Sequence, residues 1–421
     1  MLSKVTAVVV LCLAVSVEAA TRLTYMVQGK PTAIKWADSA FPVSYKVDAA
    51  ATTAIPGAQA MIGRSFDTWL APDASSVQFT SLGTASAPPG KDGVNGVSLS
   101  DNLFSGSGFL AFTTTWFDND GKIIEADIQV DASVAGDTGK FESLVQHEVG
   151  HFLGLDHSAI ISSTMYPFVA STSLNKLDSD DRIAIASMYP KPNGASLVST
   201  LRGEVQGGSG PLFGAQVVAL NESGSPVASV LSDRQGRFEM VGVPEGKYKL
   251  YVEPLDGPVD PQNLSGYWRD AHSAAFRTEF SSESFQLEVK AGQVLENLVL
   301  NASQPSTLSP RWIGTFPINT TDIKLGSTVN TVKAGDTICI AVGGEGLIGG
   351  MTQFSILSSN FSRVSDFRYG PNYVWATFKI SPDQAQGSLV VLVANGSERA
   401  TLTGGLKVDG KVSGGRTRPI G

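Results

Sequence analysis

Apolar side chains recur at helical spacing in the first half of the chain. Residues 58–70, for example, place Met61, Ile62, Phe66 and Trp69 on one face, with Pro72 beyond the end. The predicted helices are residues 58–70, 141–153 and 179–188. Strand-like alternation occupies residues 42–47, 108–112 and 123–130. This mixture predicts an α+β domain over residues 21–190.

The pattern changes after residue 190. Residues 191–198 are rich in Pro, Asn and Gly, which is typical of a linker. Short strands separated by Gly, Pro, Asn and Asp then predict two all-β sandwich domains, at residues 199–302 and 303–412. In the second of these, residues 331–340 and 388–394 are the clearest strands. Residues 413–421 are expected to form a flexible tail.

Residues 1–20 have the features of a signal peptide. Lys4 precedes an apolar run at residues 5–17, and Ala19 and Ala20 provide small residues for cleavage. An uncleaved anchor is the alternative, but the run is too short to span a bilayer. No later segment is apolar enough to do so. We therefore expect a secreted protein, extracellular or periplasmic.

Charge and cysteine content limit the partners and the disulfide bonds that the chain can have. The formal net charge is −8 and no basic stripe stands out, so nucleic acid is not an expected partner. Cys339 alone remains after removal of residues 1–20, so the mature chain cannot form an internal disulfide. Its apolar neighbours favour a buried strand cysteine over a nucleophile.

A cluster of histidines carries the chemistry. His147 and His151 are four residues apart, so on a helix they project from one face and can share a metal ion. Gly154 suits a left-handed turn that returns His157 to the same ion. Three imidazoles leave a fourth zinc position open, and Glu148 is placed to act as a general base.

Two other interpretations of the histidine cluster fit the sequence less well. A helix could carry histidines for structural reasons, but the extension through Gly154 to a third histidine argues against that. A purely structural zinc is disfavoured, because the motif supplies three ligands and a base instead of four ligands. The pattern therefore favours one catalytic zinc ion.

The segment from His147 to His157 resembles the metzincin motif His-Glu-x-x-His-x-x-Gly-x-x-His, and Ser158 is similar to the matrixin branch of that family. The resemblance covers residues 35–190. It implies a zincin fold and a hydrolase that cleaves peptide bonds in extracellular proteins, including extracellular matrix. Met165 would lie in the methionine turn beneath the metal, with Tyr166 and Pro167 in the wall of the S1′ pocket.

The same resemblance implies one further feature that this chain shares and two metal sites at which it departs from the family. Residues 108–111 correspond to the edge strand that binds extended substrate. Phe112 and Gln129 stand where ligands of a second, structural zinc are expected, so we predict a single zinc. Val134 replaces a calcium-binding glutamate that would follow Asp131.

Calcium binding near the turn at residues 118–121 is left open. Asp118 and Asp120 could hold a calcium ion, but a solvated turn is the simpler interpretation of the sequence Asp-Asn-Asp-Gly.

Residues 199–302 resemble the carboxypeptidase regulatory-like domain, a prealbumin-like β-sandwich. The matching segments are residues 202–205, 212–217, 232–238 and 243–248. His272 is expected to be a surface histidine and not a ligand. Residues 303–412 are similar to an immunoglobulin-like domain. Either β domain could contact a cell surface or a polysaccharide.

We therefore expect a zinc metalloendopeptidase that acts on protein or peptide substrates. The first alternative is an extracellular binding or adhesion protein with an inactive protease head, and the second is a zinc hydrolase of another bond. All the proposed chemistry lies in residues 21–190, so that fragment is expected to keep peptidase activity.

Overall fold

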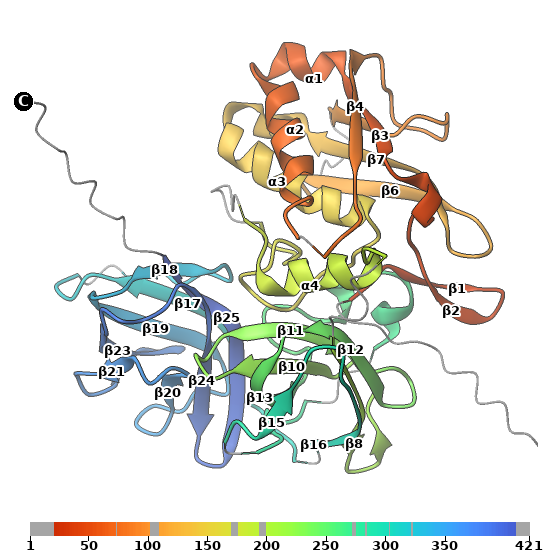
Figure 1. Ribbon diagram of the computed structural model, residues 1–421. Helices are drawn as coiled ribbons and strands as arrows, with labels where there is room; N and C mark the ends of the chain where they lie inside the picture. Colours follow the sequence, from red (N-terminus) through yellow and green to blue (C-terminus); the bar gives the residue numbers. More distant parts are fainter. Residues whose placement is uncertain are drawn as a thin grey trace, which may run out of the picture.

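The computed structural model describes residues 21–72, 74–101, 109–169, 176–192, 199–271, 275–282, 284–302, 304–320 and 323–409. The predicted signal peptide, residues 193–198 of the predicted linker, the predicted tail and His272 lie outside these residues. Figure 1 shows the helix-containing first domain above two β domains that lie side by side.

The first domain is built on a twisted sheet with the strand order β4-β3-β5-β7-β6. Strand β6 runs antiparallel to β7, whereas the other pairs are parallel. Among the described residues β6 therefore forms one edge of the sheet. The strands are β3 (Val43–Asp48), β4 (Phe79–Ala85), β5 (Gly96–Ser100), β6 (Ala111–Phe117) and β7 (Ile123–Asp131). A separate hairpin, β1 (Thr24–Val27) and β2 (Lys30–Ala33), precedes them.

Helices pack on this sheet through the apolar faces that the sequence predicts. Phe66, Trp69 and Phe152 are fully buried in one cluster with side chains of the strands. The helices are α1 (Ala49–Ala54), α2 (Ala58–Thr68), α3 (Thr138–Phe152) and α4 (Ser179–Met188), with short 3-10 turns η1 (Asp38–Ala40) and η2 (Ala132–Gly136). The three predicted helices are thus confirmed to within a few residues.

The second domain consists of two facing sheets. One has the order β11-β10-β13-β14, with β15 also paired to β13, and the other has the order β12-β8-β16, with β9 paired to β8. Leu201, Val217, Phe238 and Leu250 come from four different strands and share one core. The strands are β8 (Ser199–Gly207), β9 (Gly210–Pro211), β10 (Gln216–Asn221), β11 (Pro226–Leu231), β12 (Arg237–Val243), β13 (Gly246–Glu253), β14 (Glu279–Phe280), β15 (Leu287–Val289) and β16 (Val294–Ala302), with 3-10 turns η3 (Pro261–Asn263) and η4 (Gly266–Asp270).

The third domain also packs two sheets together. Their orders are β17-β19-β23-β21, with β22 paired to β23, and β18-β25-β24-β20. Cys339 is buried on β19, as predicted. The strands are β17 (Ser309–Phe316), β18 (Asn330–Lys333), β19 (Thr337–Glu345), β20 (Gln353–Ile356), β21 (Phe361–Arg363), β22 (Arg368–Tyr369), β23 (Tyr373–Ile380), β24 (Gly387–Asn395) and β25 (Glu398–Asp409).

Two strand predictions need correction. The strand expected at residues 331–340 is two strands, because Gly335 has a φ of +92° and turns the chain between β18 and β19. Of the strand expected at residues 108–112, Gly108 lies outside the described residues and Phe109 and Leu110 are not in a strand, whereas β6 runs from Ala111 to Phe117. The alternation of apolar residues does not reveal this shift, because the side chains of β6 are all partly buried and neither face is fully polar.

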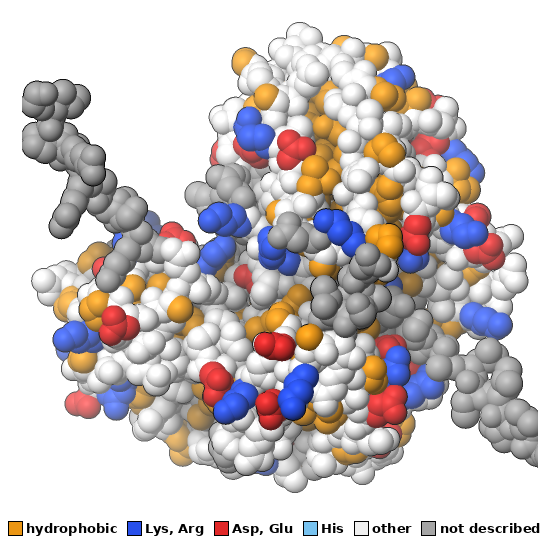
Figure 2. All heavy atoms as spheres, in the orientation of Figure 1, with side chains coloured by type: hydrophobic (Ala, Val, Ile, Leu, Met, Phe, Trp, Pro, Cys, Tyr) orange, Lys and Arg blue, Asp and Glu red, His pale blue; other side chains and the backbone are white. Residues whose placement is uncertain are grey.

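The first domain packs against the other two. Helix α4 lies between the first sheet and strands β11 and β12 of the second domain (Figure 1). Ile161 and Tyr166, which belong to the first domain by sequence, are buried in the core cluster of the third. Within the described residues, no helix has the length and apolar character needed to cross a bilayer. On the face shown in Figure 2, positive and negative side chains are interspersed.

Candidate metal centre

Helix α3 brings the first two histidines together. His147 and His151 are one turn apart, with ring centroids at 4.8 Å. The Nδ1 atom of His147 lies 2.7 Å from the carbonyl oxygen of Thr164, and that of His151 lies 2.7 Å from the carbonyl oxygen of Leu155. A carbonyl oxygen can only accept, so each Nδ1 carries the proton and each Nε2 presents a lone pair.

The third histidine reaches the same place because the chain reverses at Gly154. Gly154 has a φ of +97°, as the motif predicts, and a Cβ atom there would lie 2.2 Å from the carbonyl oxygen of Ile34. His157 follows, with its ring centroid 4.8 Å from that of His151. Its Nδ1 donates to the backbone carbonyl of Asn263, in the second domain.

The three imidazoles fit a tetrahedral metal ion. Their candidate ligand atoms all lie within 4.8 Å of one another, and Nε2 of His151 is 3.2 Å from Nε2 of His157. Zinc–nitrogen bonds of about 2.0–2.1 Å at tetrahedral angles place two nitrogens about 3.3 Å apart. The Nδ1 protons are committed to carbonyls, so two lone pairs face each other here, and a cation would relieve their repulsion.

Burial keeps the helix histidines neutral. It lowers the pKa of His147 to about 3, helped by His157 and opposed by the hydrogen bond to Thr164. Burial also moves the pKa of His151 well below its ordinary value, with further contributions from His157 and His147. Neutral imidazole is the form that binds zinc.

Glu148 is buried beside the first ligand, where the edge strand holds it. Burial raises its pKa to about 8, while a hydrogen bond from Thr113 acts in the opposite direction. Oγ1 of Thr113, on β6, lies 2.7 Å from Oε2 of Glu148 and 3.0 Å from the backbone oxygen of Glu148. The single hydroxyl proton can therefore serve the carboxylate, or turn to the carbonyl when the carboxyl group is itself the donor.

Met165 lies directly under helix α3. A Cβ atom on Gly150 would come within 2.1 Å of the Met165 sulfur and 2.8 Å of the Trp69 ring. Only glycine at this position of the motif lets the methionine approach the helix so closely. The turn is tied back to the third ligand, because the amide of Ser158 donates to the carbonyl of Met165 at 2.9 Å.

The acidic start of α4 holds this turn in place. The carboxylate of Asp181 accepts from the amides of Thr164 (2.7 Å) and Met165 (3.2 Å) and from the hydroxyl of Ser163 (2.6 Å). Burial raises its pKa to about 6. These bonds link the acidic first turn of α4 to the methionine turn.

Tyr166 and Pro167 follow the turn but face different surroundings. The Tyr166 hydroxyl donates to the carbonyl of Ser327 at 2.5 Å, in the third domain, while Pro167 is half-buried. Tyr166 also borders a pocket whose other walls include Gln146, Thr164, Val169, Thr328 and Val329. The proposed S1′ wall thus lies next to a segment that the sequence does not connect with it.

The positions considered for a second zinc ion and for calcium have contacts within the protein. Phe112 and Gln129 are directly opposite on β6 and β7, and the Gln129 amide donates to the hydroxyl of Ser100 at 2.8 Å. Oδ1 of Asp118 accepts from the amides of Asp120 and Lys122, both at 2.9 Å, as in a solvated turn. The number of zinc ions and the binding of calcium stay predictions.

Sequence reasoning missed several residues around the centre. No spacing rule connects Thr113, Asp180 or Asn263 with the motif, because their partners are distant along the chain. Asp156 lies inside the motif segment, but its second partner, Ser265, is in the second domain. Asp180 accepts from Ser158 (2.7 Å) and from the amide of Ser229 (2.7 Å), so it joins the first domain to the second. The acidic pair at the start of α4 was the sequence feature that could have indicated Asp180.

Comparison with known proteins agrees with this geometry. Residues 35–190 match the family model described as matrixin, and residues 200–256 match the carboxypeptidase regulatory-like domain. The chain therefore contains a matrixin domain followed by a carboxypeptidase regulatory-like domain.

Similarity to individual proteins is short. The chain is 38% identical over 50 residues to karilysin of Tannerella forsythia, which is 12% of this chain and 10% of karilysin. It is 42% identical over 57 residues to the hatching enzyme of Paracentrotus lividus, or 13% and 10% of the two chains. The chain thus spans about a tenth of the length of these relatives. A solved structure of the Bacillus anthracis TIE protein is 13% identical, covers 51% of this chain and 33% of its own, and has a TM-score of 0.18, too low to support an argument.

Proposed function

We propose that this protein is a secreted, zinc-dependent endopeptidase. One observation carries the proposal: three imidazoles with their Nδ1 protons bonded to carbonyls turn their Nε2 atoms toward one point, beside the buried carboxyl group of Glu148. This arrangement supplies three neutral ligands and a base, and leaves a coordination position free for water. The matrixin match over residues 35–190 supports the same class.

His147, His151 and His157 would hold the zinc. Bound there, the metal would polarise the scissile carbonyl and lower the pKa of a water molecule towards neutrality. The positive charge of the bound metal would lower the pKa of Glu148 again, so that the ionised carboxylate could take the proton from the attacking water and deliver it to the leaving amine. Thr113 would keep the carboxyl group oriented through both protonation states, because its hydroxyl can donate to the carboxylate or accept from the protonated acid.

The edge of the first sheet supports a peptide as substrate. Strand β6 pairs only with β7 in the described sheet, and Thr113 places this strand next to Glu148. An extended peptide could pair with the free edge of β6, which would bring its backbone carbonyl to the metal. Such pairing recognises the backbone of many sequences, as an endopeptidase requires.

Secretion is the part of this proposal that rests on sequence alone. Lys4, the apolar run at residues 5–17 and the small residues Ala19 and Ala20 support export, to the extracellular space or to a periplasm. The two β domains would then place the enzyme near its substrates, by contact with a cell surface or polysaccharide.

The direct test is cleavage by the purified chain. We expect hydrolysis of an unfolded protein and of peptides from a mixed library, abolished by a zinc chelator and restored by zinc. One zinc per chain is expected by elemental analysis. A chain that binds zinc but cleaves no peptide would favour the alternative of a binding protein with an inactive protease head.

A further inference from the structure

The three histidines differ in where their supporting carbonyl comes from. Thr164 and Leu155, which support His147 and His151, belong to the first domain. The carbonyl that accepts from Nδ1 of His157 belongs to Asn263, 106 residues away, at the end of the short turn η3 in the second domain. The orientation of the third ligand is thus fixed from outside the domain that carries the motif.

A second contact joins the same two segments. The carboxylate of Asp156 is buried and bridges them: Oδ1 accepts from the amide of His157 at 2.8 Å, and Oδ2 accepts from the amide of Ser265 at 2.9 Å. The ligand His157 and the residue two beyond Asn263 are therefore held by one side chain. Backbone and side chain of His157 are both positioned by this pairing.

The segment that presents Asn263 is itself held firmly. Asp260 caps η3 by accepting from the amide of Gln262 at 2.8 Å, and Oδ1 of Asn263 accepts from the amide of Asp260 at 3.0 Å. The following turn η4 is fixed through Tyr267, whose hydroxyl accepts from the amide of Arg234 at 3.1 Å.

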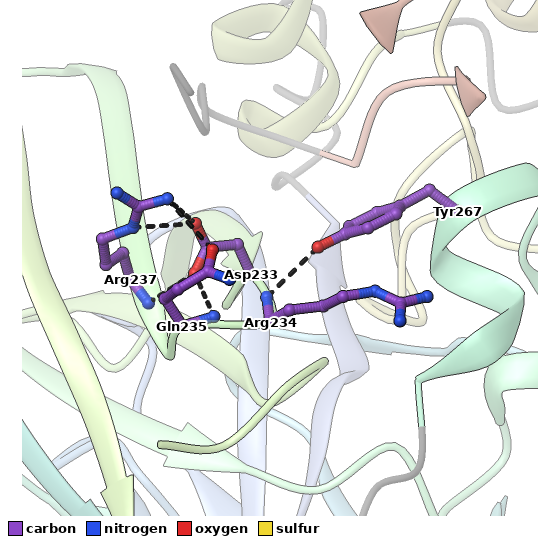
Figure 3. A network of polar contacts seen from close by, with 5 residues as sticks. All are labelled: Asp233, Arg234, Gln235, Arg237 and Tyr267. Atoms are coloured by element: carbon purple, nitrogen blue, oxygen red, sulfur yellow. Dashed lines mark hydrogen bonds and ion pairs between the residues drawn. The ribbon is translucent and has the colours of Figure 1, made fainter. Parts of the chain in front are cut away.

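Figure 3 shows how that anchor is built. Asp233 holds the neighbouring turn, with Oδ1 accepting from the amides of Gln235 and Arg237 and Oδ2 pairing with the Arg237 guanidinium at 2.7 Å. Trp268, next to Tyr267, is buried and donates from Nε1 to the carbonyl of Arg22 at 3.1 Å. The segment is thus attached to the sandwich on one side and to the first domain on the other.

We propose that the 260–271 segment of the second domain is a working part of the metal centre, which positions His157 for zinc through the carbonyl of Asn263. This rests on the proposed function only in taking zinc as the ion. Partners that orient a ligating histidine fix its tautomer and its ring direction, and their loss typically costs about 10–100-fold in metal affinity. Docking of the two domains and binding of zinc are therefore coupled.

Zinc affinity of the full-length chain, measured by chelator competition, tests the proposal. Asp260→Ala removes the cap of η3 without touching the first domain. We expect zinc binding about 10-fold weaker, at the lower end of the range for such partners. Asp260→Asn keeps an acceptor and should restore affinity. Gln293→Ala is the matched control, because Gln293 caps a different turn of the same domain by accepting from the amide of Lys290 at 3.0 Å.

The thermal midpoint of the zinc-free chain distinguishes a role of Asp260 in positioning the ligand from a role in general stability. A purely structural role for Asp260 would lower the thermal midpoint without zinc and leave the affinity of the folded chain unchanged. If Asp260→Ala fails to fold, Tyr267→Phe loses only one hydroxyl and should weaken zinc binding several-fold. Unchanged affinity in the folded variants would overturn the proposal, whereas a wild-type chain that binds no zinc would refute the proposed function itself.

The coupling between domain docking and zinc binding is reciprocal, so it can also be measured in the wild-type chain without any variant. Zinc should slow hydrogen exchange of the amides in the peptide covering residues 260–271 of the wild-type chain, Ser265 included. Strand β16 lies in the other sheet of the same domain and should be unaffected. Equal exchange in the 260–271 segment with and without zinc would contradict the coupling.

Discussion

The metal centre has two halves that are built in different ways. The helical half, with His147, Glu148 and His151 on α3, takes its supports from the first domain: Thr164, Leu155 and, on β6, Thr113. The loop half, from Asp156 to Tyr166, is held by Asp181 of the first domain and also from outside that domain. Its partners include Asn263 and Ser265 in the second domain and Ser327 and Thr403 in the third.

This difference separates what a motif encodes from what a fold supplies. A helix places two histidines and a glutamate by its own periodicity, and one strand across is enough to orient the base. A loop has no periodicity to fix it, so its ligand must be held by contacts from elsewhere. In this chain several of those contacts come from the β domains, which therefore help to build the metal centre.

The largest effect should follow the loss of a ligand from either half. His151→Ala and His157→Ala each remove one imidazole, so zinc content and peptidase activity should fall together, by more than the ~10²-fold that loss of an outer partner can cost. Elemental analysis beside kcat/KM on a peptide measures both. If His157→Ala kept full zinc and activity while His151→Ala lost them, the loop half would not belong to the metal centre.

A smaller effect is expected from the support of the base in the helical half. Thr113→Val keeps the shape of the side chain but removes the hydroxyl that lies 2.7 Å from Oε2 of Glu148. One such hydrogen bond to a charged group is worth about 1.5 kcal/mol, so kcat should fall ~10-fold with zinc content unchanged. Thr113→Ser should recover most of the loss. A change in KM alone would mean that Thr113 serves substrate binding instead.

The last effect is on stability and not on activity, and concerns the pH dependence of the free energy of unfolding through a buried carboxyl group near the loop half. Glu253 is buried between the second and third domains, where Thr403 donates to it at 2.7 Å and Thr401 also donates. Burial raises its pKa to about 7, opposed by these hydrogen bonds. The same Thr403 accepts through its carbonyl from the amide of Ile161 at 2.8 Å.

The sign of this effect follows from the raised pKa. The folded state keeps the Glu253 proton to higher pH than the unfolded state, so its stabilising effect is present below about pH 4.5 and is lost as pH rises through about 7. The free energy of unfolding should fall by at most about 3 kcal/mol over that range from this group. Chemical denaturation at several pH values measures it. Glu253→Gln should flatten the curve only in part, because burial also raises the pKa of Asp180 to about 7.

The sequence predicted the helical half of the centre well and the loop half only in outline. Spacing alone placed His147 and His151 on one face, and the positive φ of Gly154 followed from the motif. The family resemblance then pointed to Met165. None of this indicated Gly150 as the point where the Met165 sulfur meets the helix, although the glycine stands inside the motif.

The rest depended on contacts between residues far apart in sequence. Asn263 lies in a polar turn with no feature that marks it, and Thr113 is one of three consecutive threonines on β6. The fragment 21–190, expected from its chemistry to be active alone, would lack the carbonyl for His157 and expose Tyr166, Ile161 and Asp180. Tertiary packing, and not local pattern, decides such features.

One paired measurement tests the central claim, that the three histidines hold zinc while Glu148 handles the proton. Glu148→Gln keeps the size of the side chain and can still hydrogen-bond with Thr113, but it cannot take a proton at neutral pH. Zinc content should stay at one per chain while kcat/KM on a peptide falls by at least ~10²-fold. Near-normal activity in this variant would show that Glu148 is not the base, and loss of zinc with activity would show that it supports the metal instead.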